Sequence, residues 1–274
     1  MELTALLEQP FDLPCIPRVV AILLFELDRP EADLKRISQL VSGDLGLTAR
    51  LLETANDTYF GLSGNIHSVP ESLGLLGLGH VRSMVAAALP KASLKSVPGV
   101  NLQQFWNYSL NVGKVSRSLA GLLRINQQAA FTTGLLHAMG ELAMMRVMPE
   151  AMAKINPDVH PLSLKRSDVE IKVLGSDYGQ VSAALARRWR YPQAMIDALE
   201  HQADPFENDN YEPLAGVLHL ARWRARAKEA RLDDRGTAVT FPGAVGDILK
   251  LDIDMVLQQD PIDWNSTGQG KLLT

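Results

Sequence analysis

The feature that most restricts the fold of this chain is a long apolar segment, 128–148, near its middle. Apolar side chains occupy almost every turn of this segment, so a helix formed by it would be hydrophobic nearly all round. Such a helix has to be covered by other elements, because no side of it favours water. We therefore expect one central helix over 128–148, with His137 in the core of an all-α bundle.

The rest of the chain also has helical periodicity. Aromatic residues make up only 6% of the sequence, while Ala and Leu are abundant, and this composition favours helices over strands. Asp33 is an expected N-cap, and Ser167 with Glu170 fits a capping box that would open a helix reaching Trp189. The expected helices are 34–41, 47–55, 70–89 with an interruption at Gly77 and Gly79, 105–122, 128–148, 167–189, 192–201, 213–231 and 245–256.

A length of 274 residues allows one large domain or two small ones. The turn at Pro98-Gly99 favours an internal boundary. We expect an N-terminal helical part over 1–95 and a helical bundle over 96–235. Beyond a linker-like stretch at 236–243, the C-terminal extension 236–274 is expected to hold one short helix and a loose tail.

The charge and cysteine content exclude several classes. A net charge of -4 gives no overall attraction to nucleic acid or to an anionic membrane. The single Cys15 cannot form an internal disulfide, which is typical of a reducing cytoplasm. The sequence has no signal-peptide pattern and no apolar run of transmembrane length, so a cytoplasmic protein without a membrane span is expected. Two basic stretches, 187–190 and 222–228, are interpreted as solvated helix faces and not as nucleic-acid sites.

Several short segments, in a fixed order, resemble the signature of HDOD domains. That resemblance covers roughly residues 10 to 230 and implies an all-α bundle with a bacterial regulatory or signalling role. It also implies a non-catalytic relative of the HD-superfamily phosphohydrolases. The segments that carry it are 13–17, 42–52, 55–61, 66–84, 105–106, 134–137 and 218–221.

The metal-binding residues of HD phosphohydrolases are largely replaced here. Those enzymes need Asp directly after the His of the motif, whereas His137 is followed by Ala138, and a methyl group cannot bind a metal. The resemblance implies Tyr108 where a first His would lie and Arg222 where a distal Asp would lie. A guanidinium repels a divalent cation. We therefore expect no catalytic residue, no metal and no cofactor.

Two alternatives remain open for the residues around the former metal site. His137 and Glu141 lie four residues apart, on one face of a helix, and could hold a rebuilt metal site of a phosphohydrolase if His201 or Asp177 joined them. The same region could instead bind a small anionic ligand or nucleotide through Arg222. Against both stands a filled core in which His137 is buried and Arg222 pairs with a carboxylate. The candidate pocket residues are Tyr108, His137, Glu141, Tyr178, His201 and Arg222.

A second candidate site is the turn-rich loop after the second expected helix. Asn56, Tyr59, Phe60 and Gly61 in this loop are candidate partner-binding residues, although Asn56 could equally cap a helix. Together these features predict a non-catalytic signalling protein that acts through protein contact and conformational change. Its partner is expected to be another signalling protein that the sequence does not name, and no oligomeric state is predicted.

Overall fold

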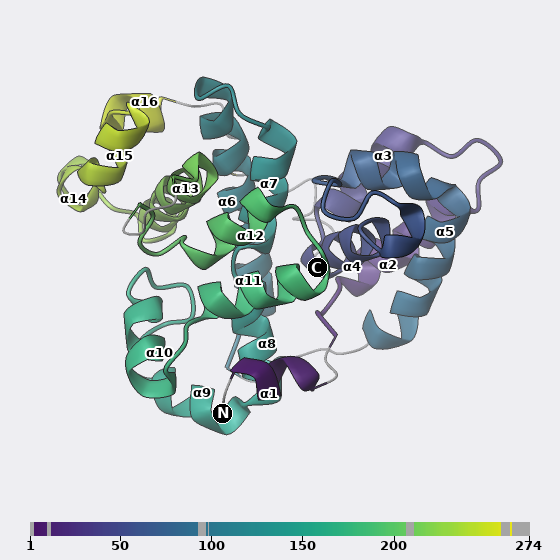
Figure 1. The fold of residues 1–274 in the computed structure, drawn as a ribbon, viewed down its shortest axis with the longest axis horizontal. Helices are drawn as coiled ribbons and strands as arrows, with labels where there is room; N and C mark the ends of the chain where they lie inside the picture. Colours follow the sequence, from purple (N-terminus) through teal and green to yellow (C-terminus); the bar gives the residue numbers. More distant parts are fainter. Residues whose placement is uncertain are drawn as a thin grey trace.

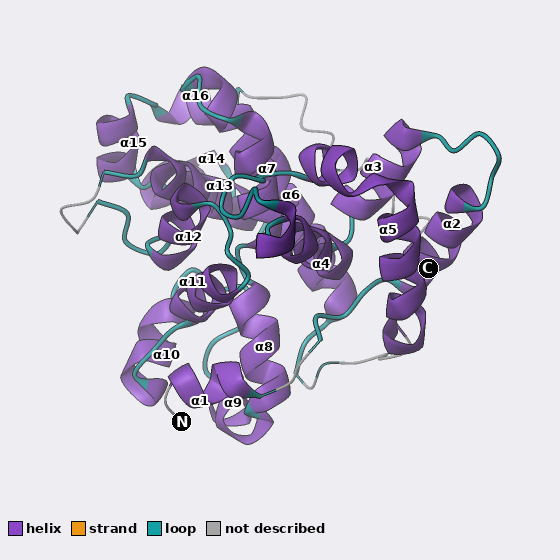
Figure 2. Cartoon of the chain, turned by 45° about the vertical axis from the view of Figure 1, so that its right-hand side comes forward, coloured by secondary structure: helices purple, strands orange, loops and turns teal. Residues whose placement is uncertain are grey.

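The computed structural model describes residues 3–9, 12–92, 97, 99–206, 211–258 and 264. These residues form helices joined by loops, and no strand is found among them beyond one isolated backbone bridge between Val97 and Val100 (Figure 2). The prediction of an all-α fold is confirmed.

The first group of helices packs around α5, on the right of Figure 1. α2 and α4 both lie against α5, and α3 covers the three of them. The short α1 does not join this group; it lies against α11, where the guanidinium of Arg188 donates to the carbonyl of Leu7. The elements of the N-terminal part are α1 (Leu3–Glu8), α2 (Pro17–Leu27), α3 (Leu34–Ser42), α4 (Leu45–Ala55), the 3-10 turn η1 (Thr58–Phe60) and α5 (Val69–Ala92).

The two signature segments at 13–17 and 42–52 are joined by one buried carboxylate. Asp44 caps α4 by accepting from the N–H of Leu47 at 2.8 Å, and it also accepts from the N–H of Ile16 at 2.5 Å. Gly46 permits this approach, since a Cβ there would lie 2.5 Å from the carbonyl oxygen of Pro14. Asp44 therefore ties the segment 13–17 to the start of α4.

The second group has α6, α7 and α13 at its centre and α8 to α12 around them (Figure 1). α6 and α7 approach closely because glycines face each other: a Cβ on Gly134 would lie 2.7 Å from the Cα of Gly113. α4 also touches α7, which links the two groups. The helices are α6 (Leu102–Leu122), α7 (Gln127–Leu136), α8 (Met139–Val147), α9 (Pro149–Ile155), α10 (Arg166–Leu174), α11 (Tyr178–Arg188), α12 (Gln193–Glu200) and α13 (Pro213–Glu229).

The expected single helix over 128–148 is wrong: the segment is two helices, α7 and α8, broken at His137 and Ala138. Ala138 has φ -111° and ψ 23°, outside the helical region. The carbonyl of His137 accepts from the side chains of Ser182 and Gln202, and the N–H of Gly140 donates to Ser182. Tertiary hydrogen bonds therefore replace the helical ladder at the position of the motif.

The expected helix over 167–189 is also two helices, α10 and α11. Gly175, with φ 81°, ends α10 in the left-handed conformation that glycine favours. The capping box is formed by Asp177 and Gln180 at the start of α11, and not by Ser167 and Glu170.

The described residues after α13 form three short helices where a linker and one helix were expected. Asp233 caps α14 (Asp234–Thr240), which extends into the expected linker at 236–243. The predicted helix over 245–256 divides into α15 (Gly243–Leu249) and α16 (Ile253–Leu257), because Lys250 between them has φ 57°. The expected loose tail lies outside the described residues, apart from Trp264.

One helix among the described residues is long and apolar enough to span a membrane by length and composition, namely Val69–Pro90 within α5. A third of that stretch is buried against other helices, and its backbone is non-helical at Gly77. This is weak evidence for a membrane span, because core helices of globular proteins pass the same test.

Candidate functional site

His137 lies at the junction of α7 and α8 and is buried. Its Nδ1 lies 2.8 Å from the carbonyl oxygen of Gly134. A carbonyl can only accept, so Nδ1 carries the proton in this contact. His137 is thus held in one tautomer by its own helix, as expected of a core histidine.

Three other predicted residues surround the imidazole. The Tyr108 ring lies 5.5 Å from the His137 ring, and the Tyr108 hydroxyl donates to the backbone carbonyl of Arg222 at 3.2 Å. The guanidinium of Arg222 lies 5.5 Å over the ring of Tyr178 and donates to the carbonyl of Gln202 at 2.7 Å. We call Tyr108, His137, Tyr178 and Arg222 the core cluster; all four side chains are buried.

The core cluster favours the neutral form of each titrating member. Burial, and then the charge of Arg222, lower the pKa of His137 from 6.5 to about 3. Burial raises the pKa of Tyr108 to about 12 and that of Tyr178 still further, although Arg222 opposes both shifts. His137 is therefore uncharged at every physiological pH, and Arg222 carries the charge of this cluster.

Glu141, a fifth predicted pocket residue, points into a different cluster that the sequence analysis missed. Arg166 donates from Nε to Oε1 of Glu170 at 2.6 Å, and Tyr178 N–H donates to Oε2 of Glu170 at 2.8 Å. The Nη2 of Arg166 lies 2.8 Å from Oε1 of Glu141 but is aligned with Asn156 Oδ1 at 2.9 Å. Glu141 therefore has charge proximity to Arg166 without an aligned hydrogen bond.

We call Glu141, Arg166 and Glu170 the buried triad, since the side chains of all three are fully buried. Burial, followed by the charge of Glu170, raises the pKa of Glu141 well above 4.5. One guanidinium faces two carboxyl groups, so a proton on Glu141 balances the charge. Glu141 thus faces Arg166 and Glu170 and not the core cluster. The i, i+4 spacing of Arg166 and Glu170 was the signal for this pair in the sequence.

His201, the sixth candidate, does not enter the core cluster. It follows the last turn of α12 and is partly exposed. Its neighbour Gln202 takes the inner position, where its side chain donates to the carbonyl of His137 and its own carbonyl accepts from Arg222 and contacts His219 at 3.0 Å. Gln202 thus contacts two members of the core cluster, although it was not among the candidate residues.

The residues present do not fit a divalent metal. The motif position after His137 is Ala138, and the guanidinium of Arg222 lies in the same core cluster. Among the described residues, no group of three or more His, Cys, Asp or Glu side chains converges in a way that could hold a metal. The core cluster offers one histidine, two tyrosines and a guanidinium, without a carboxylate to neutralise a divalent cation.

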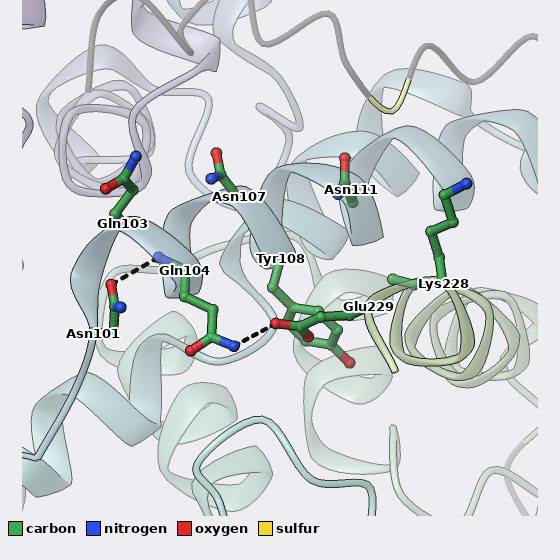
Figure 3. Close-up of a pocket in the computed structure, with 9 residues that line it drawn as sticks. Asn101, Gln103, Gln104, Asn107, Tyr108, Asn111, Lys228 and Glu229 are labelled. Atoms are coloured by element: carbon green, nitrogen blue, oxygen red, sulfur yellow. Dashed lines mark hydrogen bonds between the residues drawn. The ribbon is translucent and has the colours of Figure 1, made fainter. Parts of the chain in front are cut away.

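An open pocket lies next to the core cluster, between the first half of α6 and the end of α13 (Figure 3). Its volume is about 380 Å³, and Tyr108 forms part of its wall. Across it, Gln104 donates to Glu229 at 2.6 Å. The pocket is lined by a row of carboxamides: Asn101, Gln103, Gln104, Asn107 and Asn111.

The candidate partner loop divides into a buried anchor and an exposed tip. Asn56 is buried; its amide donates to the carbonyls of Leu52 and Ile66, and its oxygen accepts from two backbone N–H groups. Phe60 packs edge-on against His80, with ring centroids 5.8 Å apart. Tyr59 is 85% exposed, so it is the part of this loop that a partner could reach.

The loop is attached to the corner that follows α11. The Gly64 N–H donates to the carbonyl of Arg190 at 3.1 Å, and the Arg190 side chain lies 3.5 Å from Asp57. Beside it, the Tyr191 hydroxyl donates to the carbonyl of Ala49 in α4 at 2.8 Å. Because α11 begins at Tyr178 of the core cluster and ends beside this corner, one helix connects the two candidate sites.

Comparison with known proteins finds a relative in sequence, similar solved structures and a matching family. A curated, uncharacterized protein of Treponema pallidum (strain Nichols) is 25% identical over 225 residues, which cover 78% of this chain and 42% of that protein. This chain therefore corresponds to less than half the length of that relative.

Among solved structures, the response regulator MmoQ from Methylococcus capsulatus str. Bath superposes with a TM-score of 0.72 at 23% identity, covering 90% of this chain and 97% of that one. A fragment of the same protein gives 0.70 at 25% identity, covering 90% of this chain and 95% of the fragment. A candidate phosphohydrolase from Shewanella amazonensis SB2B gives 0.60 at 25% identity and covers 99% and 97% of the two chains.

The sequence matches the HDOD domain family over residues 13–205, which is well over half of the chain and includes both candidate sites except Arg222. The fold agrees with that match, and so does the order of the signature segments. This chain belongs to the HDOD domain family.

Proposed function

We propose that this protein is a non-catalytic signalling protein that works through contact with another protein. The observation that carries the proposal is Arg222, a cation inside the core cluster where an HD phosphohydrolase would need a metal ligand. Family membership supports the signalling role, and so does the likeness to a response regulator.

The proposed mechanism uses α11 as the connecting element. Tyr178 at its start packs under Arg222, and Arg190 beyond its end holds the loop that carries Tyr59. Eleven helical residues span roughly 16 Å at about 1.5 Å per residue, so a shift of this helix is transmitted across that distance. A signal that repacks the core cluster would then change the presentation of Tyr59.

Non-catalysis is tested by metal loading and hydrolysis. The full chain is incubated with Mn²⁺, Fe²⁺ or Zn²⁺, dialysed and measured by plasma mass spectrometry, and it is then assayed with bis(p-nitrophenyl) phosphate. The expected result is no stoichiometric metal and no hydrolysis above a His137→Ala control. Stoichiometric metal, together with hydrolysis that the His137→Ala change abolishes, would establish the phosphohydrolase alternative.

The protein-contact role is tested with a photo-crosslinker. Benzoylphenylalanine is placed at Tyr59 or, as a matched control, at Val239, which is 78% exposed on α14. In the native cells, the residue at 59 is expected to give a discrete cross-linked product that the residue at 239 does not give. Identical products from both positions, or none from 59, would contradict the role assigned to the loop.

A second candidate function, a small-ligand sensor, is favoured by the open pocket in Figure 3. Carboxamides both donate and accept, which suits the edge of a nucleobase or a sugar. A nucleotide that raises the melting temperature without being hydrolysed would support this function, provided that Asn107→Leu removes the shift.

A further inference from the structure

A groove separates the first group of helices from the second, and neither candidate site includes it. One wall is formed by α3, and the other by α6 and the start of α7. Its volume is about 800 Å³, compared with about 380 Å³ for the pocket in Figure 3. Because its walls come from both groups, an occupant of this groove contacts both at once.

The walls of the groove carry opposed rows of cations. Lys35 and Arg36 project from α3, and Lys114 and Arg117 project from α6. The one carboxylate on the lining is Asp33, which accepts from the backbone N–H of Arg36 at 3.0 Å as the N-cap of α3. Four cations and one carboxylate line this groove, in a chain whose net charge is -4.

Part of this charge is already balanced from within. Arg36 lies 3.0 Å from the buried Glu26, so it serves the packing of α2 against α3. Lys35 and Arg117 are exposed on opposite walls, and Arg117 lies 5.2 Å over the ring of Phe131. These two side chains are therefore the best placed to meet an anionic occupant.

The lining between the cations is partly apolar, with Ser38, Gln39, Ser42 and Gln128 as its polar members. Ile22 from α2, Leu40 from α3, Leu110 from α6 and Phe131 from α7 are lining residues, and Leu40 and Leu110 are buried. A small inorganic anion would leave this surface unused. A peptide that presents both carboxylates and large apolar side chains would satisfy the cations and cover the apolar lining together.

We propose that this groove binds an acidic segment of a partner protein, in which carboxylate residues flank at least one large apolar residue. The inference rests on the proposed function, since it names the chemistry of the partner. Charge complementarity sets the attraction and its salt dependence, while apolar contact with Phe131 and its neighbours sets the register. Binding across α3 and α6 would fix the position of the first group relative to the second.

The experiment measures binding of fluorescein-labelled peptide pools to the full chain by fluorescence polarisation. In one pool Asp or Glu alternates with Leu, Ile or Phe; in the matched pool Asn and Gln replace the acids. The variant Lys35→Glu/Arg117→Glu reverses the charge at two positions that line the groove. The control variant Lys172→Glu/Arg235→Glu changes the net charge equally at exposed positions outside it. Circular dichroism and urea melts confirm that both variants are folded.

The expected result is saturable binding of the acidic pool that weakens as salt rises. The affinity should fall at least tenfold in the groove variant and stay within about twofold in the control variant. Equal binding of both pools, equal losses in both variants, or no binding would overturn the proposal. Direct binding of triphosphate or of a labelled single-stranded oligonucleotide, without peptide binding, would overturn the proposal and assign the groove to those anions instead. None of these outcomes depends on metal or hydrolysis, so they are distinguishable from failure of the proposed function.

Discussion

Replacing Glu141 by Gln tests whether the buried triad holds a proton at neutral pH. Neither oxygen of Glu141 accepts a hydrogen bond within the described structure, although both are buried. Glu170 accepts from two N–H donors and is the better anion for Arg166. A protonated Glu141 is an uncharged group, so its amide isostere should replace it with little change in shape or charge.

The magnitude follows from the pKa of Glu141, which burial and then the Glu170 charge raise above 4.5. The folded protein therefore keeps a proton that the unfolded chain releases above that pH. The resulting stabilisation is complete below pH 4.5 and is lost as the pH rises toward the raised pKa. Within that window, the wild-type free energy of unfolding should fall by about 1.4 kcal/mol per pH unit relative to the Gln variant.

Urea denaturation of both proteins, followed by circular dichroism at several pH values between 5 and 8, measures this difference. Taking the difference removes other buried acids such as Asp44, whose pKa burial raises to about 6, because they titrate in both proteins. The variant should gain stability relative to wild type at every step up in pH. A difference that does not change with pH would refute a protonated Glu141.

Glu170→Gln is the matched control in the same triad. The Glu170 carboxylate accepts two hydrogen bonds, and the Gln side chain would put an amide donor against one of these two donors. A buried hydrogen bond broken in this way costs about 1–3 kcal/mol, so the variant should be less stable than wild type across the whole pH range. If both Gln variants behaved alike, the assignment of the proton to Glu141 would be wrong.

Four further substitutions, one of them a control, test the core around the two candidate sites. Asn56→Asp replaces the amide donor by a carboxylate oxygen that faces two carbonyl oxygens, and it should lower the free energy of unfolding by about 2 kcal/mol or more in urea melts. Gly140→Ala would put a Cβ 2.2 Å from a backbone oxygen of α11 and should be strongly destabilising. As the control, the Cβ of Gly74→Ala meets nothing within 4 Å, and the free energy of unfolding should rise by up to about 1 kcal/mol. Similar melting temperatures for the two variants would contradict the packing. Ala138→Asp restores the residue that HD phosphohydrolases place after His137, yet it should bind no stoichiometric metal by plasma mass spectrometry because Arg222 remains; bound metal would refute that reasoning.

Helix content was predictable from the sequence because apolar periodicity and caps are local signals. Asp33 and Asp44 both cap helices as local chemistry predicts. The break within the segment 128–148 was not predictable in the same way. The break at His137 exists because side chains 45 and 65 residues away bind its carbonyl, and no local pattern encodes such partners.

Only part of the candidate pocket could be predicted from the sequence. Tyr108, His137, Tyr178 and Arg222 lie together, whereas Glu141 and His201 do not join them. Glu141 shares a helical segment with His137 in the sequence, but the break between α7 and α8 removes the i, i+4 relation on which that expectation depended.

The guanidiniums of Arg166 and Arg222, both buried, explain how this core holds together with residues that do not suit a metal. In the hydrolases that it resembles, a metal ion would join ligands from separate helices. Here Arg222 joins α13 to the carbonyl that follows α12, and Arg166 joins α10 to the loops around Asn156 and Val159. A guanidinium makes several directional hydrogen bonds at once, so it can fix helices in one arrangement as an ion does. Unlike an exchangeable ion, it cannot leave, so in the proposed mechanism a change of state in this core would come from movement of α11 or from loss of the proton on Glu141.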